Sequence, residues 1–317
     1  MSASRVLRVL APNPSPMTLE GTNSYLIFAG ARVLAIDPGP PIAGHVDAIV
    51  AAAAARDATI AAIAVTHGHP DHAPAAALLR ARTGAPVYGH ARATFAVDRA
   101  VGEADRIVVA DDGGEEATLR VFDAPGHARD HLAFAFDVEA ALFTGDIVVG
   151  RGTIVIAPPY GDMRAYQRTL ARLRRDCAGA RTIYGGHGDA VRNPRAKLDE
   201  YIAHRERREV ELLAALDLGE RTLPQLVATI YAAVTPVLWP AAARQLLAYL
   251  IALESEGRVT ARTLGRPPTP DEAAILNPDL SRIVDADAAA VAAAELGFDR
   301  GLATLDAYSI ASTTLPN

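Results

Sequence analysis

Apolar and polar positions along the first two hundred residues alternate in a pattern that mixes short strands with helices. Segments 24–30 and 32–39 predict a β-hairpin that turns at Gly30, and the uninterrupted apolar run 59–65 predicts a buried strand. Other predicted elements are helices 45–57, 72–84 (closed by Gly84) and 163–176, strands 86–90, 106–111, 118–126 and 181–186, and a hairpin over 131–146. This order predicts an α/β (α+β) domain whose helices lie outside its sheets.

The pattern becomes almost entirely helical from about residue 193. One long helix is predicted over 194–217, where opposite charges recur at spacings of three and four. Two more helices and a short strand are predicted over 223–234 and 241–262. One face of the last helix carries Leu246, Leu250 and Leu253. Helices that end in a short strand in this way are typical of a winged helix.

We therefore divide the chain into residues 1–217, a winged-helix-like segment at 218–265 and an acidic C-terminal extension at 266–317, whose role the sequence does not indicate. Segment 265–270 (GRPPTP) has the composition of a linker, and an alanine-rich stretch at 286–297 could form a helix. The extension holds eight acidic residues against three arginines, so it accounts for most of the net charge of -6. The rest of the chain is close to neutral.

Composition narrows the class of protein. Half of the 317 residues are hydrophobic (50%), which is enough for a substantial core. No apolar run reaches the roughly 18 residues of a membrane span, and the N-terminal apolar stretch is too short for a secretory signal. Cys177 is the only cysteine, which predicts a reducing, cytoplasmic location without disulfides. The charge shows no basic footprint of the kind that nucleic-acid binding needs.

The stretch 65–74 (VTHGHPDHAP) gathers three histidines and an aspartate directly after a predicted buried strand. His67 and His69 are two residues apart and so project to one side of an extended segment, while Asp71 and His72 open the next helix. Imidazole nitrogen and carboxylate oxygen suit Zn²⁺, and also Fe²⁺ or Mn²⁺. A polar turn is the alternative, but desolvating four such groups without a metal is costly.

Three further metal-capable residues each follow a predicted strand beside a glycine: His127, Asp146 and His187. Seven candidate ligands are too many for one tetrahedral ion and suit two, which we predict to be Zn²⁺. One ion could be held by His67, His69 and His127, and the other by Asp71, His72 and His187, with Asp146 bridging.

These motifs, in this order, resemble the metallo-β-lactamase superfamily over about residues 5–215. Segments 13–27, 36–40, 124–131 and 235–259 resemble more specifically the lactamase-beta-2-like family. The resemblance implies an αββα sandwich with a metal pair at one edge, followed by a small winged-helix domain. It also implies a metal-dependent hydrolase.

Two metal ions would lower the pKa of a bridging water from about 16 toward 7, which makes hydroxide available at neutral pH. Asp71 or Asp146 could then pass a proton to the leaving group, and the sequence does not decide between them. His131, four residues after His127, and Asp37 could orient ligands without binding the metal themselves. The alternatives are a buried histidine bonded to backbone and an aspartate that caps a turn.

Several substrates fit this chemistry. A small ester, thioester or amide is favoured, whereas a β-lactam is not, because true β-lactamases commonly have serine or cysteine at positions such as Asp146. A phosphodiesterase, specifically a single-strand endoribonuclease, is the alternative, and a non-catalytic DNA-binding sensor is a third. The winged-helix segment has four arginines against three glutamates, and Lys197 is the only lysine of the chain. We therefore expect a small-molecule partner rather than a nucleic acid, no membrane partner, and leave a homodimer open.

Overall fold

The computed structural model describes residues 5–278 and 305–311 of the chain. Its described residues form two compact units, the first within 1–154 and 168–199 and the second within 155–167 and 200–317. This division falls before the boundary that we predicted at residue 217.

Six strands form the first sheet, in the order β1-β2-β3-β4-β5-β6. They are β1 (Val6–Leu10), β2 (Asn23–Ala29), β3 (Arg32–Ile36), β4 (Thr59–Ala64), β5 (Val87–His90) and β6 (Arg99–Val101). The predicted hairpin is confirmed, because β2 and β3 pair antiparallel from Tyr25 opposite Ile36 to Ala29 opposite Arg32. From β3 to β6 all pairs are parallel, so the carboxyl ends of these strands share one edge.

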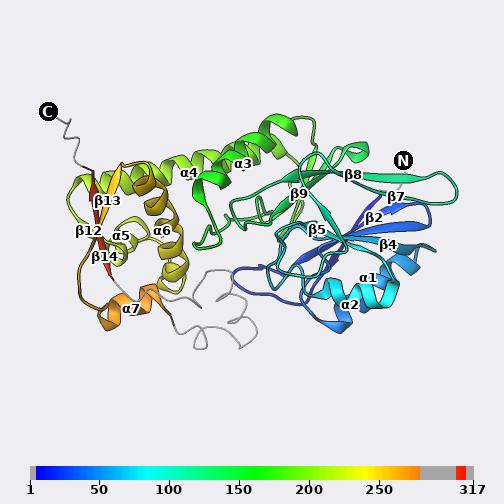
Figure 1. Cartoon of the computed structure of the whole chain (residues 1–317), viewed down its shortest axis with the longest axis horizontal. Coiled ribbons are helices and arrows are strands. Elements are labelled where there is room, and N and C mark those ends of the chain that lie inside the picture. Colours follow the sequence, from blue (N-terminus) through cyan, green and yellow to red (C-terminus); the bar gives the residue numbers. More distant parts are fainter. Residues whose placement is uncertain (1–4, 279–304, 312–317) are drawn as a thin grey trace. The chain divides into compact units, whose positions relative to one another are not determined.

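Helices α1 (Ala43–Ala54) and α2 (Ala75–Thr83) cover the outer face of this sheet (Figure 1). Their apolar residues pack with Leu26, Val33 and other side chains of that face in one buried cluster, which includes Val46 of α1 and Leu79 of α2. Gly84 ends α2 in the left-handed conformation, with φ 71°, as the sequence predicts.

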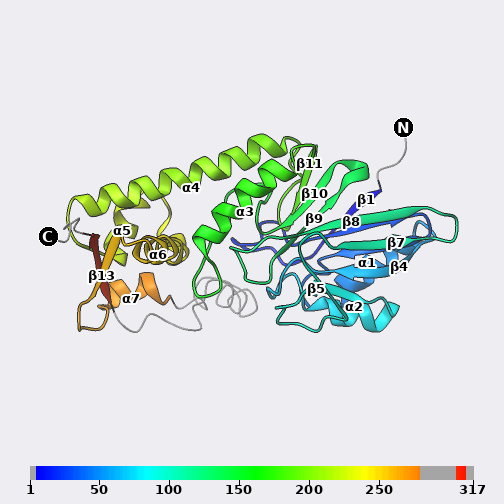
Figure 2. The ribbon, with the colours of Figure 1, turned by 45° about the horizontal axis from the view of Figure 1, so that its top comes forward.

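Five strands form the second sheet, in the order β11-β10-β9-β8-β7. They are β7 (Arg106–Ala110), β8 (Glu116–Asp123), β9 (Leu132–Phe136), β10 (Ala141–Gly145) and β11 (Thr182–Gly185), with a 3-10 turn η1 (Asp137–Glu139) between β9 and β10. Buried side chains of both sheets, such as Ile27 and Phe134, form the core between them. Helix α3 (Met163–Asp176) lies outside the second sheet, where Thr169 Oγ1 donates to Pro125 O and Arg172 lies over the ring of Phe122 (Figure 2). The predicted αββα order is therefore confirmed.

The second unit contains the winged-helix segment. The elements of this unit are α4 (Pro194–Asp217, which begins in the first unit), β12 (Arg221–Thr222), α5 (Leu223–Ile230), η2 (Pro236–Leu238), α6 (Trp239–Ser255), β13 (Val259–Thr263), α7 (Pro270–Leu276) and β14 (Asp306–Ile310). The predicted leucine face of α6 is buried, with Leu246, Leu250 and Leu253 at 0% exposure. Helix α5 begins at a capping box formed by Thr222 and Gln225.

The end of the chain differs from the separate extension that the sequence suggested. Strand β14 lies between β12 and β13 and pairs antiparallel with both, so part of the segment after residue 266 completes the small sheet. The predicted linker at 265–270 runs directly into α7. The predicted helix at 286–297 lies outside the described residues.

The sequence analysis expected no apolar segment long enough to span a membrane, but one helical segment reaches that length and composition. Residues 236–255 meet that length, with a mean hydropathy of 1.3 in the most apolar window, but 67% of that window is buried inside the structure. Burial of this kind is typical of a core helix, and α6 occupies the core of the second unit.

Candidate metal centre

The predicted ligands lie just beyond the carboxyl ends of strands in the first unit. The loops follow β4 (His67, His69, Asp71 and His72), β8 (His127), β10 (Asp146) and β11 (His187). Backbone hydrogen bonds join these regions, from Leu132 N at the start of β9 to Thr66 O at 2.7 Å and from Gly186 N to Gly145 O at 2.8 Å. The ligand loops of both sheets therefore meet at one edge of the sandwich.

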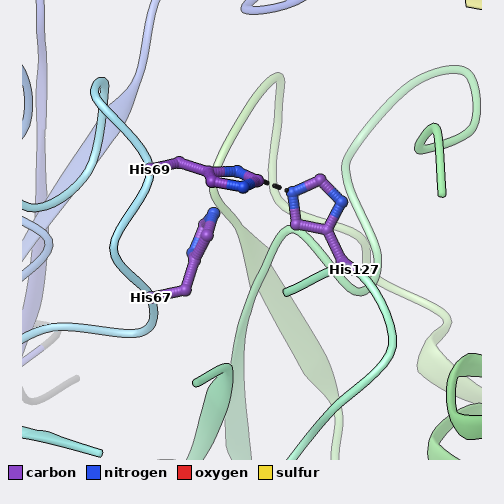
Figure 3. A group of neighbouring side chains, drawn as sticks. All are labelled: His67, His69 and His127. Atoms are coloured by element: carbon purple, nitrogen blue, oxygen red, sulfur yellow. Dashed lines mark hydrogen bonds between the residues drawn. The ribbon is translucent and has the colours of Figure 1, made fainter. Parts of the chain in front are cut away.

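The first ligand group consists of His67, His69 and His127, which offer nitrogens within 4.8 Å of one another. Figure 3 shows their rings turned toward one another, with the first two on one loop and the third on another. His127 Nε2 lies 3.0 Å from His69 Nδ1, and the ring centroids of His67 and His69 are 4.5 Å apart. Three converging imidazoles are a known ligand set for catalytic zinc.

The second ligand group consists of Asp71, His72 and His187. Asp71 Oδ2 lies 3.3 Å from Nε2 of both His72 and His187. The carboxylate of Asp146 lies 3.5 Å from His72, 3.3 Å from His187 and 3.8 Å from His127. Asp146 therefore contacts members of both groups, which is the position predicted for a bridging ligand.

The buried polar atoms of this cluster fit a bound cation. His67 Nε2, His72 Nε2, Asp71 Oδ1 and Asp146 Oδ1 are buried and have no hydrogen-bond partner among the described residues. A buried polar atom without a partner costs free energy, and metal ions held by the two ligand groups would offset that cost. The nitrogen and oxygen donor set suits zinc, and equally iron or manganese.

The two groups differ in their charge. Burial and the neighbouring His127 lower the pKa of His69 to about 3, so this imidazole is neutral at physiological pH. Burial also acts to lower the pKa of His187, but Asp146 and Asp71 outweigh it and raise that pKa to about 10. The same carboxylates raise the pKa of His72 well above its usual value. Without metal, the second group therefore holds protonated imidazoles against ionised carboxylates.

Zinc binding to the second group is expected to release protons, because a ligand imidazole must be neutral. Affinity at this group should rise with pH through the neutral range, because the pKa of His187 is about 10 and that of His72 is also raised, whereas protonation of His69, with a pKa of about 3, should not affect the first group above about pH 5. Calorimetric titration of metal-free protein with Zn²⁺ at about pH 7.5, in two buffers of different ionisation enthalpy, counts the released protons. Equal heats in both buffers would contradict this expectation.

Asp37, which the sequence analysis proposed as an orienting residue, contacts His72 of the second group. Its carboxylate accepts hydrogen bonds from Thr66 N at 2.7 Å, from Thr66 Oγ1 at 2.8 Å and from His72 Nδ1 at 2.9 Å. With Nδ1 held in this way, His72 Nε2 is the nitrogen directed at Asp71 and Asp146. A carboxylate that fixes the tautomer of a ligand histidine is a common feature around metal sites.

His131 contacts both parts of the cluster. Its Nε2 accepts a hydrogen bond from Asp146 N at 3.1 Å, so the proton of the neutral ring lies on Nδ1. Its ring stacks on that of His67, with centroids 4.5 Å apart and planes at 21°. His131 therefore fixes the backbone of one candidate ligand and the ring of another.

Thr22 is a residue to which the sequence reasoning gave no role. Its Oγ1 donates to Asp71 Oδ2 at 3.0 Å and accepts from Asn13 Nδ2 at 3.0 Å. The loop before β2 therefore reaches the second ligand group. The small polar residues that follow Gly21 are the only local sign of this contact in the sequence.

Residues 17–187 match the metallo-beta-lactamase superfamily. The chain belongs to this superfamily. All seven candidate ligands lie within the matched region, and residues 222–265 match the beta-lactamase associated winged helix domain. The predicted family and its appended winged helix are thereby confirmed.

Relatives of this metallo-β-lactamase superfamily member include a beta-lactamase-like protein 2 homolog of Caenorhabditis elegans. The two are 34% identical over 220 residues, which are 67% of this chain and 70% of that protein. The atrochrysone carboxyl ACP thioesterase of Aspergillus fumigatus is 33% identical over 221 residues, which are 68% of this chain and 66% of the thioesterase. A metallo-beta-lactamase family protein from Thermus thermophilus shares the fold, with a TM-score of 0.67 at 23% identity over 81% of this chain and 96% of that one.

Proposed function

We propose that the chain is a dinuclear metal-dependent hydrolase that cleaves a small ester, thioester or amide. The observation that carries this proposal is that two ligand groups lie side by side and that the Asp146 carboxylate lies close to a histidine of each. Two Zn²⁺ ions there, or Fe²⁺ or Mn²⁺, would supply hydroxide at neutral pH and polarise the scissile carbonyl. No serine or cysteine nucleophile is needed.

The residues of the chain have distinct parts in this proposal. Asp146 connects the two ligand groups, since its carboxylate lies within 3.8 Å of imidazoles in both. Asp71 lies in one group only, where Thr22 donates to its Oδ2, and its Oδ1 has no hydrogen-bond partner among the described residues. Because Asp71 belongs to one group only, whereas Asp146 contacts both, we assign to the Asp71 carboxylate the transfer of the proton to the leaving group.

A thioester is the substrate class that we favour. The Aspergillus fumigatus relative is named as a thioesterase that acts on an acyl carrier protein, and it is similar to this chain over 221 residues. Such similarity supports the reaction type without identifying the acyl group. We propose a small acyl thioester, encountered in the cytoplasm, as the first substrate to test.

The charges of the winged-helix segment disfavour the endoribonuclease and the DNA-binding sensor. Arg258 forms ion pairs with Glu209 and Glu256. Arg262 pairs with Glu220, and Arg244 is 2% exposed. Three of the four arginines of the segment are thus neutralised or buried, which leaves little positive charge for phosphate contacts.

A substrate panel tests the proposal. Protein with its metal content measured by elemental analysis is assayed with acyl thioesters, esters, lactones, β-lactams and a labelled single-stranded RNA, beside the His69→Ala variant. Thioester or ester turnover that requires both metal and His69 is the expected result. RNA cleavage without any thioester or ester turnover would favour the nuclease instead.

A further inference from the structure

Asp130 lies behind the first ligand group and has no part in the roles described so far. Its side chain is 7% exposed, and it follows His127 by three residues in the loop between β8 and β9. Burial raises the pKa of its carboxyl group, and the nearby backbone N–H groups of Asp130 itself and of Gly68 act in the opposite direction. Because Gly68 separates His67 from His69, one carboxylate joins the two loops that carry all three imidazoles of this group.

Gly68 packs closely against this carboxylate. A Cβ at Gly68 would lie 3.0 Å from Asp130 Oδ2 and 2.5 Å from Thr94 Oγ1. The absence of a side chain therefore allows the backbone between the two histidines to approach Asp130. The sequence shows this glycine but not the residue that it accommodates.

Burial of the Asp130 carboxylate costs free energy, and its contacts among the described residues do not offset that cost. Its Oδ2 has no hydrogen-bond partner among the described residues, and burial raises the pKa of the carboxyl group. The positively charged or titratable groups that act on it are His90 and Arg92. His90 Nε2, however, lies 3.7 Å from a different carboxylate, that of Asp123. The main contact of Asp130 is thus with the backbone of Gly68, between the two histidines.

We propose that Asp130 is a positioning residue, which holds the backbone of Gly68 so that His67 and His69 converge with His127 on one metal ion. The inference rests on the metal-dependent function proposed above. A fixed backbone at Gly68 sets the direction of the side chains on both sides of it. Interactions of this kind, made outside the ligands themselves, typically account for about 10- to 100-fold in metal affinity.

Two substitutions separate the hydrogen bond from mere packing. Asp130→Ala removes the acceptor, whereas Asp130→Asn keeps an oxygen that can accept from Gly68 N–H. Asp111→Ala is the matched control, because Asp111 also accepts from backbone N–H groups, those of Gly113 and Glu115, but in the turn between β7 and β8. Each protein is titrated with Zn²⁺ against a competing chelator, and the absorption spectrum of its Co²⁺ form is recorded.

One of the two ions is expected to bind about 10- to 100-fold more weakly to Asp130→Ala, with a changed Co²⁺ spectrum. Asp130→Asn and the Asp111→Ala control should match the unchanged protein in both measurements. Gly68→Ala, whose Cβ would lie 2.5 Å from Thr94 Oγ1 and 3.0 Å from Asp130 Oδ2, should weaken the same ion and provides the test if Asp130→Ala does not fold. Unchanged affinity and spectrum in Asp130→Ala or Gly68→Ala, or an Asn variant that binds no better than the Ala variant, would overturn the proposal. The number of ions bound by the unchanged protein tests the proposed function separately.

Discussion

Asp146→Asn is expected to reduce thioester or ester turnover by more than about 100-fold while the fold is retained. Asparagine preserves the size of the side chain but removes the charge that lies between His72, His127 and His187. Loss of a residue that only orients a ligand already costs about 10- to 100-fold, so the loss of a shared ligand should exceed that range. The measurements are kcat/KM and bound metal per chain, together with circular dichroism to confirm the fold.

Asp189→Asn is the control for this substitution. Asp189 follows His187 by two residues, but its side chain is 94% exposed and its contact is a surface ion pair with Arg8 at 3.1 Å. Exposed pairs of this kind contribute little to stability, so turnover and metal content should not change. An Asp146→Asn protein that keeps two ions and full turnover would show that Asp146 does not bridge the two groups.

The clustering of the candidate ligands could be predicted from the sequence because each of them lies shortly after a strand. The alternation of side chains in an extended segment placed His67 and His69 on the same side. The β4 strand is apolar along its whole length after Thr59, and a polar cluster directly after it stood out for that reason. His127 and His187 each follow a predicted strand and stand next to a glycine, which is a local signal of a different kind.

The contacts of Thr22 and Asp130 around these residues could not be predicted, because they join residues that are distant in sequence. Thr22 and Asp71 are 49 residues apart, and the contact between Asp130 and Gly68 joins two different loops. A single polar side chain in a loop has no periodic pattern that would mark its partner. Such contacts become visible only when the pairing of the strands is known.

Strand β14 was missed for a related reason. It is short, it follows a long acidic segment, and both of its neighbours, β12 and β13, precede that segment in the chain. Its pattern of buried Ala307 and Tyr308 beside more exposed residues is too brief to distinguish a strand from a turn. The winged-helix segment could be predicted from its helices, but the strand that completes its sheet could not.

Gly186→Ala is expected to disrupt the metal centre as strongly as the loss of a ligand, although it removes no ligand atom. A Cβ at this position would lie 2.3 Å from Asp146 Oδ1 and 2.6 Å from His72 Cε1. The backbone cannot shift to avoid these contacts, because Gly186 N donates to Gly145 O and Gly186 O accepts from Asn23 N at 2.7 Å. The two ligand side chains must therefore move apart.

Overpacking of this kind costs about 1–3 kcal/mol of folding free energy, which a protein of this size can tolerate. We therefore expect a folded Gly186→Ala protein that has lost one ion and more than about 100-fold in turnover, since its ligands are displaced further than when an outer contact is removed. Gly44→Ala in α1 is the control, because a Cβ there meets no atom within 4 Å. Metal content and kcat/KM of both variants decide the matter. Full occupancy in Gly186→Ala would mean that the space between Asp146 and His72 does not hold an ion, and the ligand grouping would have to be redrawn around His67, His69 and His127 alone.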